Sequence, residues 1–112
     1  MALPRLKRRR EFLRVAAEGK RAARPGVVLQ ARPEPDAPLR VGFTATKKIG
    51  GAVVRNRAKR RLREAARLLL SDAPPGWDVV LIAREATPTR RFAALLGDVS
   101  GALAALGVEH RR

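Results

Sequence analysis

The stretch LRVGFTATKKIGGAVVRNRAKRRLREAARLLL, residues 39–70, decides the fold. Its first part, Leu39 to Thr46, alternates apolar side chains along one side, which is typical of a strand. Gly50 and Gly51 follow, and a long run from about Ala52 to Leu70 then places apolar residues at helical spacing. A strand followed closely by a helix of this length predicts a domain in which helices pack on a sheet.

The rest of the sequence predicts further strands and helices on both sides of this stretch. The spacing of apolar residues predicts a short basic helix over Leu6–Glu18. The β-branched run Gly26–Ala31 and the almost continuously apolar run Trp77–Ala83 predict strands, the second of them buried on both faces. A last helix is expected after Thr87, its N-cap, and Pro88, its first-turn residue.

These elements predict the fold class. Residues 32–38 (RPEPDAP) contain three prolines and two acids, so we expect strands 26–31 and 39–46 to form a hairpin with an irregular loop. The pattern predicts an α/β (α+β) two-layer sandwich with three helices and a mixed four-stranded sheet. A length of 112 residues suits one core. Residues 1–112 are therefore expected to form a single domain with flexible ends at about 1–5 and 108–112.

The composition points to a polyanionic partner. The chain has 25 Lys and Arg against 10 Asp and Glu, a formal net charge of +15. Twenty of the 25 cations are arginine, which binds phosphate bidentately and stacks on bases. This preference favours nucleic acid over an anionic membrane as the partner.

The composition also excludes several classes of site. There is no cysteine, so disulfides, thiolate metal sites and cysteine nucleophiles are excluded. The longest apolar runs are far shorter than the roughly 20 residues of a membrane span, and the sequence shows no signal peptide. We therefore expect a cytoplasmic protein without a membrane partner.

A helical wheel divides residues 52–70 into two faces. The apolar face spans about 120° and consists of Val54, Ala58, Leu62, Ala65, Ala66 and Leu69. The opposite face is cationic and is interrupted mainly by Glu64. It consists of Asn56, Arg60, Arg63 and Arg67, with Lys59 on one flank and Arg57 and Arg61 on the other.

The density of charge on this helix predicts RNA binding. Residues 55–67 hold seven cations and one acid, whereas a solvated helix usually interleaves the two signs. Asn56 can donate and accept hydrogen bonds, as base edges and 2′-hydroxyls require, although it could also be an ordinary first-turn residue. The preceding turn, Thr46–Gly51, is not a Walker A loop because its lysines precede its glycines. We interpret it as a phosphate-contacting turn at a helix N-terminus.

The run Arg40 to Arg63 closely resembles the most characteristic region of the bacterial ribonuclease P protein component. Arg55-Asn56-Arg57, followed by Lys59-Arg60 and Arg63, resembles the family's arginine-rich motif, and Lys47-Lys48-Ile49-Gly50 resembles the segment that leads into it. The resemblance extends over nearly the whole chain. It also includes Leu6-Lys7, Glu11-Phe12, Gly19-Lys20 and the run Val79–Arg84.

The resemblance implies an accessory subunit of an endoribonuclease. Such a subunit binds an M1-type catalytic RNA, the ribonuclease P RNA, and helps it to remove 5′ leaders from precursor tRNA. The RNA performs the chemistry with Mg2+ bound mainly through the RNA, and neither catalytic residues nor an obligate protein partner is expected of the chain. The family fold further implies a left-handed crossover through the arginine-rich helix, where general topology rules favour a right-handed one.

The resemblance also implies roles for individual residues. Phe12, Lys7 and Phe43 would line the cleft for the single-stranded leader, although Phe12 could instead be an ordinary core residue. The chain has Ala16 where the family often has a second aromatic, so leader binding should depend more on charge than on stacking. The residues expected to contact the catalytic RNA are Lys47, Lys48, Arg55, Asn56, Arg57, Lys59, Arg60, Arg63 and Arg67.

Three other classes of protein share some of these features. A ribosomal or other structural RNA-binding protein would have a similar charge and fold. A DNA-binding regulator would place the basic helix in a major groove, but no paired-helix motif or dimerisation heptad is present. A stand-alone nuclease is disfavoured because His110 lies in the expected tail and there is no metal-ligand cluster. Asp72, Asp78 and Glu85 are interpreted as ordinary surface acids flanking the last strand.

Overall fold

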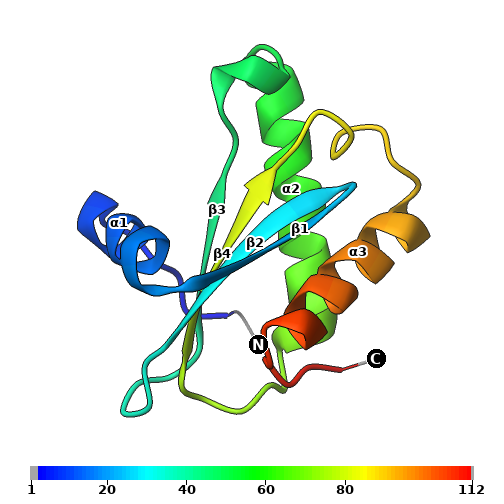
Figure 1. Cartoon of the computed structure of the whole chain (residues 1–112). Coiled ribbons are helices and arrows are strands. Elements are labelled where there is room, and N and C mark those ends of the chain that lie inside the picture. The colour runs from blue at the N-terminus through cyan, green and yellow to red at the C-terminus, as the bar shows by residue number, and fades with distance from the viewer. Residues whose placement is uncertain (1–2, 112) are drawn as a thin grey trace.

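The computed structural model describes residues 3–111. Within this range it contains three α-helices and a mixed four-stranded sheet, which confirms the predicted fold class (Figure 1). The elements in chain order are α1 (Arg9–Glu18), β1 (Lys20–Arg24), β2 (Val27–Pro33), β3 (Arg40–Thr44), the 3-10 helix η1 (Lys47–Ile49), α2 (Ala52–Leu70), β4 (Trp77–Ala83) and α3 (Phe92–Ala105).

The strands lie in the order β1-β2-β4-β3. β2 is antiparallel to both β1 and β4, whereas β3 is parallel to β4. The expected hairpin between strands 26–31 and 39–46 is therefore wrong, because β4 lies between β2 and β3. The apolar run of β4 explains this position, since a strand covered on both faces is most stable in the middle of a sheet.

β1 is the strand that the sequence pattern did not reveal. Its sequence is KRAAR, and only Ala22 is buried. It pairs with β2 through a tight turn, with Arg24 opposite Val27. An edge strand needs few apolar side chains, and its basic residues discourage pairing with another chain. A strand of this kind carries almost no hydrophobic signal.

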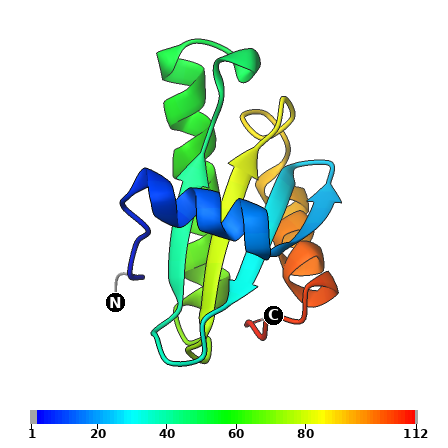
Figure 2. The same cartoon turned by 60° about the vertical axis from the view of Figure 1, so that its left-hand side comes forward.

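α2 connects the parallel strands β3 and β4 by a left-handed crossover. In Figure 2 both strands run upwards, β4 lies to the right of β3, and α2 returns the chain behind the sheet. This is the opposite of the usual right-handed connection. The crossover places one long side of α2 on the outside of the domain.

Helices cover both faces of the sheet. α2 and α3 pack on one face, and α1 crosses the other (Figures 1 and 2). The main core, between the sheet and the helix pair, includes the fully buried Leu62 and Leu81. A smaller core under α1 contains Val15 and Val80.

Two helices begin later than the sequence predicted. The backbone N–H of Leu6 donates to Val41 O (2.8 Å), so the chain reaches α1 as an extended segment beside β3. Thr87 does not cap α3. Its buried hydroxyl accepts from the N–H of Arg84 and donates to Gly26 O (both 2.7 Å), which ties the turn after β4 to the β1–β2 turn. α3 then starts at Phe92.

We expected flexible ends, but residues near both ends make ordered contacts. Arg5 forms a parallel bridge with Val41 at the edge of β3. Val108 is buried, and the backbone N–H of Arg111 donates to Leu69 O (2.8 Å). Residues 1, 2 and 112 lie outside the described residues.

An ionic network fixes α1 to the sheet. Arg40 of β3 donates to both carboxylate oxygens of Asp78 (both 2.9 Å) and to Glu11 of α1 (2.8 Å). The backbone N–H groups of Arg8 and Lys7 donate to the other Glu11 oxygen (both 2.8 Å). These bonds, with the charge of Arg40, hold the pKa of Glu11 down to about 2. The network therefore sets the position of α1 over β3 and β4.

The substitution Glu11→Gln should make stability less dependent on acid pH. A carboxyl group whose pKa is lowered by folding stabilises the protein above its unfolded value, and the contribution is lost as the pH falls from 4.5 towards about 2. We expect the free energy of unfolding, measured with urea, to fall less steeply over this interval in the variant. Some dependence will remain because Arg32 and Arg67 lower the pKa values of Glu34 and Glu64. An unchanged steepness would contradict the role of Glu11.

Candidate nucleic-acid interface

The outer side of α2 carries the cations that the helical wheel predicted. The inner side is buried at Ala58, Leu62, Ala65, Ala66 and Leu69, which confirms the apolar face. Arg55 and Lys59 are half-buried at its margins. The exposed arginines of this side, together with Asn56, form what we call the α2 stripe: Asn56, Arg57, Arg60, Arg63 and Arg67.

Most arginines of the α2 stripe are not used by the protein itself. Within residues 3–111, Arg57, Arg60 and Arg63 form no side-chain hydrogen bond or ion pair, whereas Arg67 donates to both oxygens of Glu64 (2.5 and 3.1 Å). This hydrogen-bonded pair raises the pKa of Arg67 and lowers that of Glu64. It also neutralises the one acid within the cationic face, so the stripe presents net positive charge to a partner.

Arg61 does not belong to the exposed surface on which the wheel placed it. Its guanidinium donates to the backbone carbonyls of Thr87 and Arg90 and is half-buried. These carbonyls belong to the segment between β4 and α3, which no local sequence pattern connects to α2. Arg61 therefore joins α2 to the start of α3.

The turn before α2 contains η1 and two exposed lysines, Lys47 and Lys48. Gly50 ends η1 with a φ of 140°, a conformation that other residues rarely adopt. Gly51 precedes α2 without a side-chain cap, so the positive end of the helix dipole lies beside the lysines. This arrangement suits a phosphate group.

The residues predicted for the leader cleft do not all come together. Phe12 packs on the α1 side of the sheet, where a Cβ atom on Gly42 would lie 2.5 Å from its ring. Phe43 follows Gly42 on β3 and therefore points to the opposite face, where it packs against the main core and lies 5.1 Å from the guanidinium carbon of Arg5. The sheet separates Phe43 from Phe12, so the two cannot share a cleft. Lys7 is exposed beside α1.

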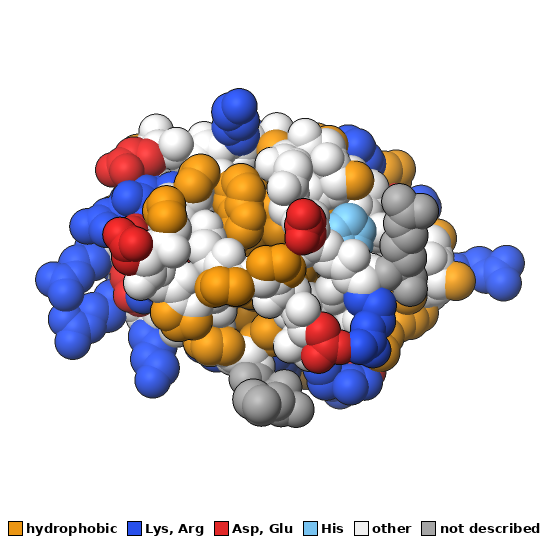
Figure 3. Space-filling model, turned by 90° about the horizontal axis from the view of Figure 1, so that it is seen from below, with side chains coloured by type: hydrophobic (Ala, Val, Ile, Leu, Met, Phe, Trp, Pro, Cys, Tyr) orange, Lys and Arg blue, Asp and Glu red, His pale blue; other side chains and the backbone are white. Residues whose placement is uncertain are grey.

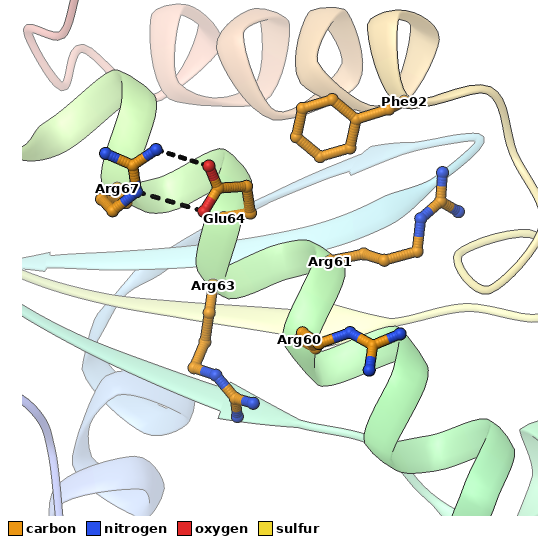
Figure 4. A pocket seen from close by; sticks show the side chains of 6 residues that line it. All are labelled: Arg60, Arg61, Arg63, Glu64, Arg67 and Phe92. Carbon is orange, nitrogen blue, oxygen red and sulfur yellow. Dashed lines mark hydrogen bonds and ion pairs between the residues drawn. The ribbon is translucent and has the colours of Figure 1, made fainter.

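Two hollows border the α2 stripe. One, of about 480 Å³, lies between α2 and the start of α3 and is lined by Arg60, Arg61, Arg63, Glu64, Arg67 and Phe92 (Figure 4). The other, of about 190 Å³, is lined by Leu3, Arg5, Val41, Phe43, Arg63 and Arg67. Phe92 packs against the main core and, through the packing of α3 against α2, also lies beside the stripe.

The surface charge is uneven around the molecule. The end of the sheet near residues 34–39 and 71–76 exposes hydrophobic and acidic side chains, with Lys and Arg projecting from its margins (Figure 3). Among the helices of the described range, none has the length and apolar character needed to cross a membrane. Because it exposes acidic side chains, the end of the sheet in Figure 3 is less suited to a polyanion than the α2 stripe.

The acids that flank β4 do not form a metal site. Asp78 was expected at the surface, but it is buried and bonded to Arg40 because the network under α1 requires a carboxylate there. Asp72 pairs instead with Arg111. Over residues 3–111 no group of three or more His, Asp or Glu side chains is placed to hold a metal ion.

Comparisons with known sequences agree with the resemblance. The sequence model of the family Ribonuclease P matches residues 2–107. The ribonuclease P protein component of Gluconacetobacter diazotrophicus is 54% identical over 106 residues, which cover 93% of this chain and 91% of that protein. The component of Caulobacter vibrioides is 55% identical over 108 residues, with 94% and 72% covered.

Solved structures of similar proteins have the same architecture. The RNase P protein of Staphylococcus aureus superposes with a TM-score of 0.81 at 25% identity and covers 93% of this chain and 95% of its own. The RNase P protein from Thermotoga maritima has a TM-score of 0.74 at 31% identity, with 91% and 94% covered.

Proposed function

Because the chain belongs to the ribonuclease P protein family, we propose that it is the protein subunit of ribonuclease P and assists the removal of 5′ leaders from precursor tRNA. In this proposal the RNA subunit is the catalyst and the chain supplies binding surfaces. The observation that carries the proposal is the α2 stripe, in which three exposed arginines have no partner within residues 3–111.

The α2 stripe and the η1 lysines together form the surface for the RNA subunit. Arg57, Arg60 and Arg63 bind phosphates, and Asn56 offers both a donor and an acceptor to a base edge or a 2′-hydroxyl. Lys47 and Lys48 extend the surface to the start of α2, where the helix dipole favours a phosphate. Arg55 and Lys59 lie at its margins, and Arg67 is paired with Glu64, so these three residues add to the attraction at longer range.

The leader lies on the opposite side of the sheet, along α1. Phe12 supplies an aromatic ring there, and Lys7 is exposed beside it. Arg9, Arg10 and Arg14 are also exposed on α1. Single-stranded RNA is bound by such a combination of cations and an aromatic ring. Because Phe43 points to the other face, it takes no part in leader binding.

The Mg2+ needed for cleavage is bound mainly through the RNA subunit in this proposal. The role of the chain is to neutralise phosphates where the RNA subunit and the substrate meet. That neutralisation lowers the concentration of Mg2+ that the RNA requires. A subunit acting on precursor tRNA is expected in the cytoplasm.

The decisive experiment is cleavage of precursor tRNA by the RNA subunit, reconstituted with and without the chain at low Mg2+. We expect the chain to accelerate leader removal and to bind the RNA subunit in the absence of substrate. If the chain instead co-sediments with ribosomal subunits and leaves cleavage unchanged, it is a structural RNA-binding protein of another kind.

The substitution Phe12→Leu should reduce the preference for precursor over mature tRNA. Leucine retains the apolar contact with Val15 and Val80 but removes the aromatic face on which a leader base would stack. A stacked base contributes about 1–3 kcal/mol, so we expect a loss of roughly fivefold or more in precursor affinity. The measurement is binding of the reconstituted holoenzyme to the two tRNA forms. Phe43→Leu, on the other face, should leave the preference unchanged.

A further inference from the structure

Phe92 places an aromatic ring at the edge of the α2 stripe. It is the first residue of α3 and lies, half-buried, in the hollow of about 480 Å³ beside α2. That volume falls within the range of about 300–1,000 Å³ typical of small-molecule sites. Figure 4 shows the ring under α3, on the side of α2 from which Glu64 and Arg61 extend, whereas Arg63 points away from it.

The backbone that carries the ring is held by hydrogen bonds within the protein. Arg61 donates to the carbonyls of Thr87 and Arg90, on the segment that leads into α3. The backbone N–H of Leu95 donates to Arg91 O (2.9 Å) and closes the first turn of the helix. A ring held in this way loses little conformational entropy on binding.

The charges around Phe92 suit a nucleotide. Four arginines and one acid line the hollow, and Arg67 occupies the carboxylate of that acid, Glu64. Arg60 and Arg63 remain without a hydrogen-bonding partner in residues 3–111, and Figure 4 shows no bond from either. An aromatic ring and free guanidinium groups that line one hollow form a combination that can bind an unpaired base and a neighbouring phosphate.

The second hollow lacks this combination. Its aromatic residue, Phe43, already has the guanidinium of Arg5 over its ring at 5.1 Å. In the part of the chain that the structure describes, Phe92 has no such cation contact. A base could therefore stack on Phe92 without displacing a cation.

We propose that Phe92 is the stacking platform for one unpaired nucleobase of the RNA subunit, whose phosphate Arg60 and Arg63 bind. This inference rests on the proposed function, because it takes the RNA that binds the α2 stripe as the source of the base. It assigns the base to the RNA subunit because the sheet separates Phe92 from the α1 side, where the leader lies. Stacking adds selectivity for unpaired RNA to a surface that otherwise binds phosphates.

The test compares Phe92→Leu and Phe92→Tyr with the unaltered chain in equilibrium binding to the RNA subunit at several salt concentrations. Leucine keeps the contact with the core and removes the aromatic face, whereas tyrosine keeps the face. We expect at least a fivefold loss of affinity for Phe92→Leu, an unchanged salt dependence, and affinity within about twofold of the unaltered chain for Phe92→Tyr. Affinity of Phe92→Leu within twofold of the unaltered chain would overturn the proposal. If the unaltered chain does not bind the RNA subunit, the proposed function itself fails.

A second measurement uses the unaltered chain and does not depend on how the variants fold. The ring protons of Phe92 are followed by nuclear magnetic resonance during titration with single-stranded oligoadenylate, and separately with an RNA duplex without loops. Stacking should shift these signals upfield with the single strand and not with the duplex. Shifts of the α2 amide signals without any shift of the Phe92 ring would contradict the proposal while leaving the binding role of α2 intact.

Discussion

Replacing Arg57 and Arg60 together by alanine should weaken binding to the RNA subunit and reduce its salt dependence by about 1.4 to 1.8 units of log–log slope. Each arginine that binds a phosphate releases counterions, and each lost contact lowers the slope by roughly 0.7 to 0.9 units. Both side chains are exposed and have no partner within residues 3–111, so their removal should not alter the thermal unfolding midpoint. The measurement is the dissociation constant between about 50 and 200 mM salt.

Arg111→Ala provides the matched control for this double substitution. It removes one positive charge from a side chain that pairs with Asp72, away from the α2 stripe. We expect its slope to equal that of the unaltered chain. A double variant with weaker binding but an unchanged slope would show that Arg57 and Arg60 do not contact phosphate. Loss of binding with loss of folded structure would contradict their assignment to an exposed surface.

The elements that the sequence predicted correctly are those whose pattern depends only on residues close together in the chain. The faces of α2 follow from the spacing of its own residues, and Ala58 and Leu62 are buried where the wheel placed them. β4 is revealed by its apolar run for the same reason. β1 was missed because an edge strand such as KRAAR needs only one buried side chain, Ala22. The sequence pattern predicted a four-stranded sheet but located only three of its strands.

The errors concern contacts between residues far apart in the chain. The hairpin was expected between neighbours in sequence, whereas β4 pairs with both β2 and β3. Asp78 was interpreted as a surface acid because its partner, Arg40, lies 38 positions away. The surroundings of Arg61 and Phe92 likewise depend on the packing of α3 against α2. This packing half-buries Arg61 and places Phe92 beside the α2 stripe. Composition and periodicity do not report such contacts.

In the proposed function, the two sides of the sheet carry two separate RNA-binding surfaces. α1 faces one way with Phe12, and α2 faces the other way with the stripe and Phe92. The left-handed crossover matters here, because it carries α2 to the face that α1 does not cover. A thin sheet between the two surfaces lets one small domain contact a large RNA and a single-stranded leader together. The position of α1 on the sheet therefore affects function as well as stability.

The substitution Asp78→Ala tests the network that holds α1 in this position. The Asp78 side chain is 2% exposed and accepts two hydrogen bonds from Arg40, which is 28% exposed. Removing one partner of a buried pair costs about 3–5 kcal/mol, and the remaining bond from Arg40 to Glu11 places the expected loss near the lower limit. We expect the free energy of unfolding in urea to fall by about 3 kcal/mol.

Replacing a surface aspartate by alanine tests whether the burial of Asp78 causes the expected loss of stability. Asp72 pairs with Arg111, and both side chains are more than 60% exposed, so Asp72→Ala should cost less than about 1 kcal/mol. A double-mutant cycle of Asp78→Ala with Arg40→Ala should give a coupling energy of about 1–3 kcal/mol, because the two side chains share two hydrogen bonds. If Asp78→Ala and Asp72→Ala destabilise the protein equally, the network does not hold α1. α1 would then depend on the small core around Val15 and Val80 alone.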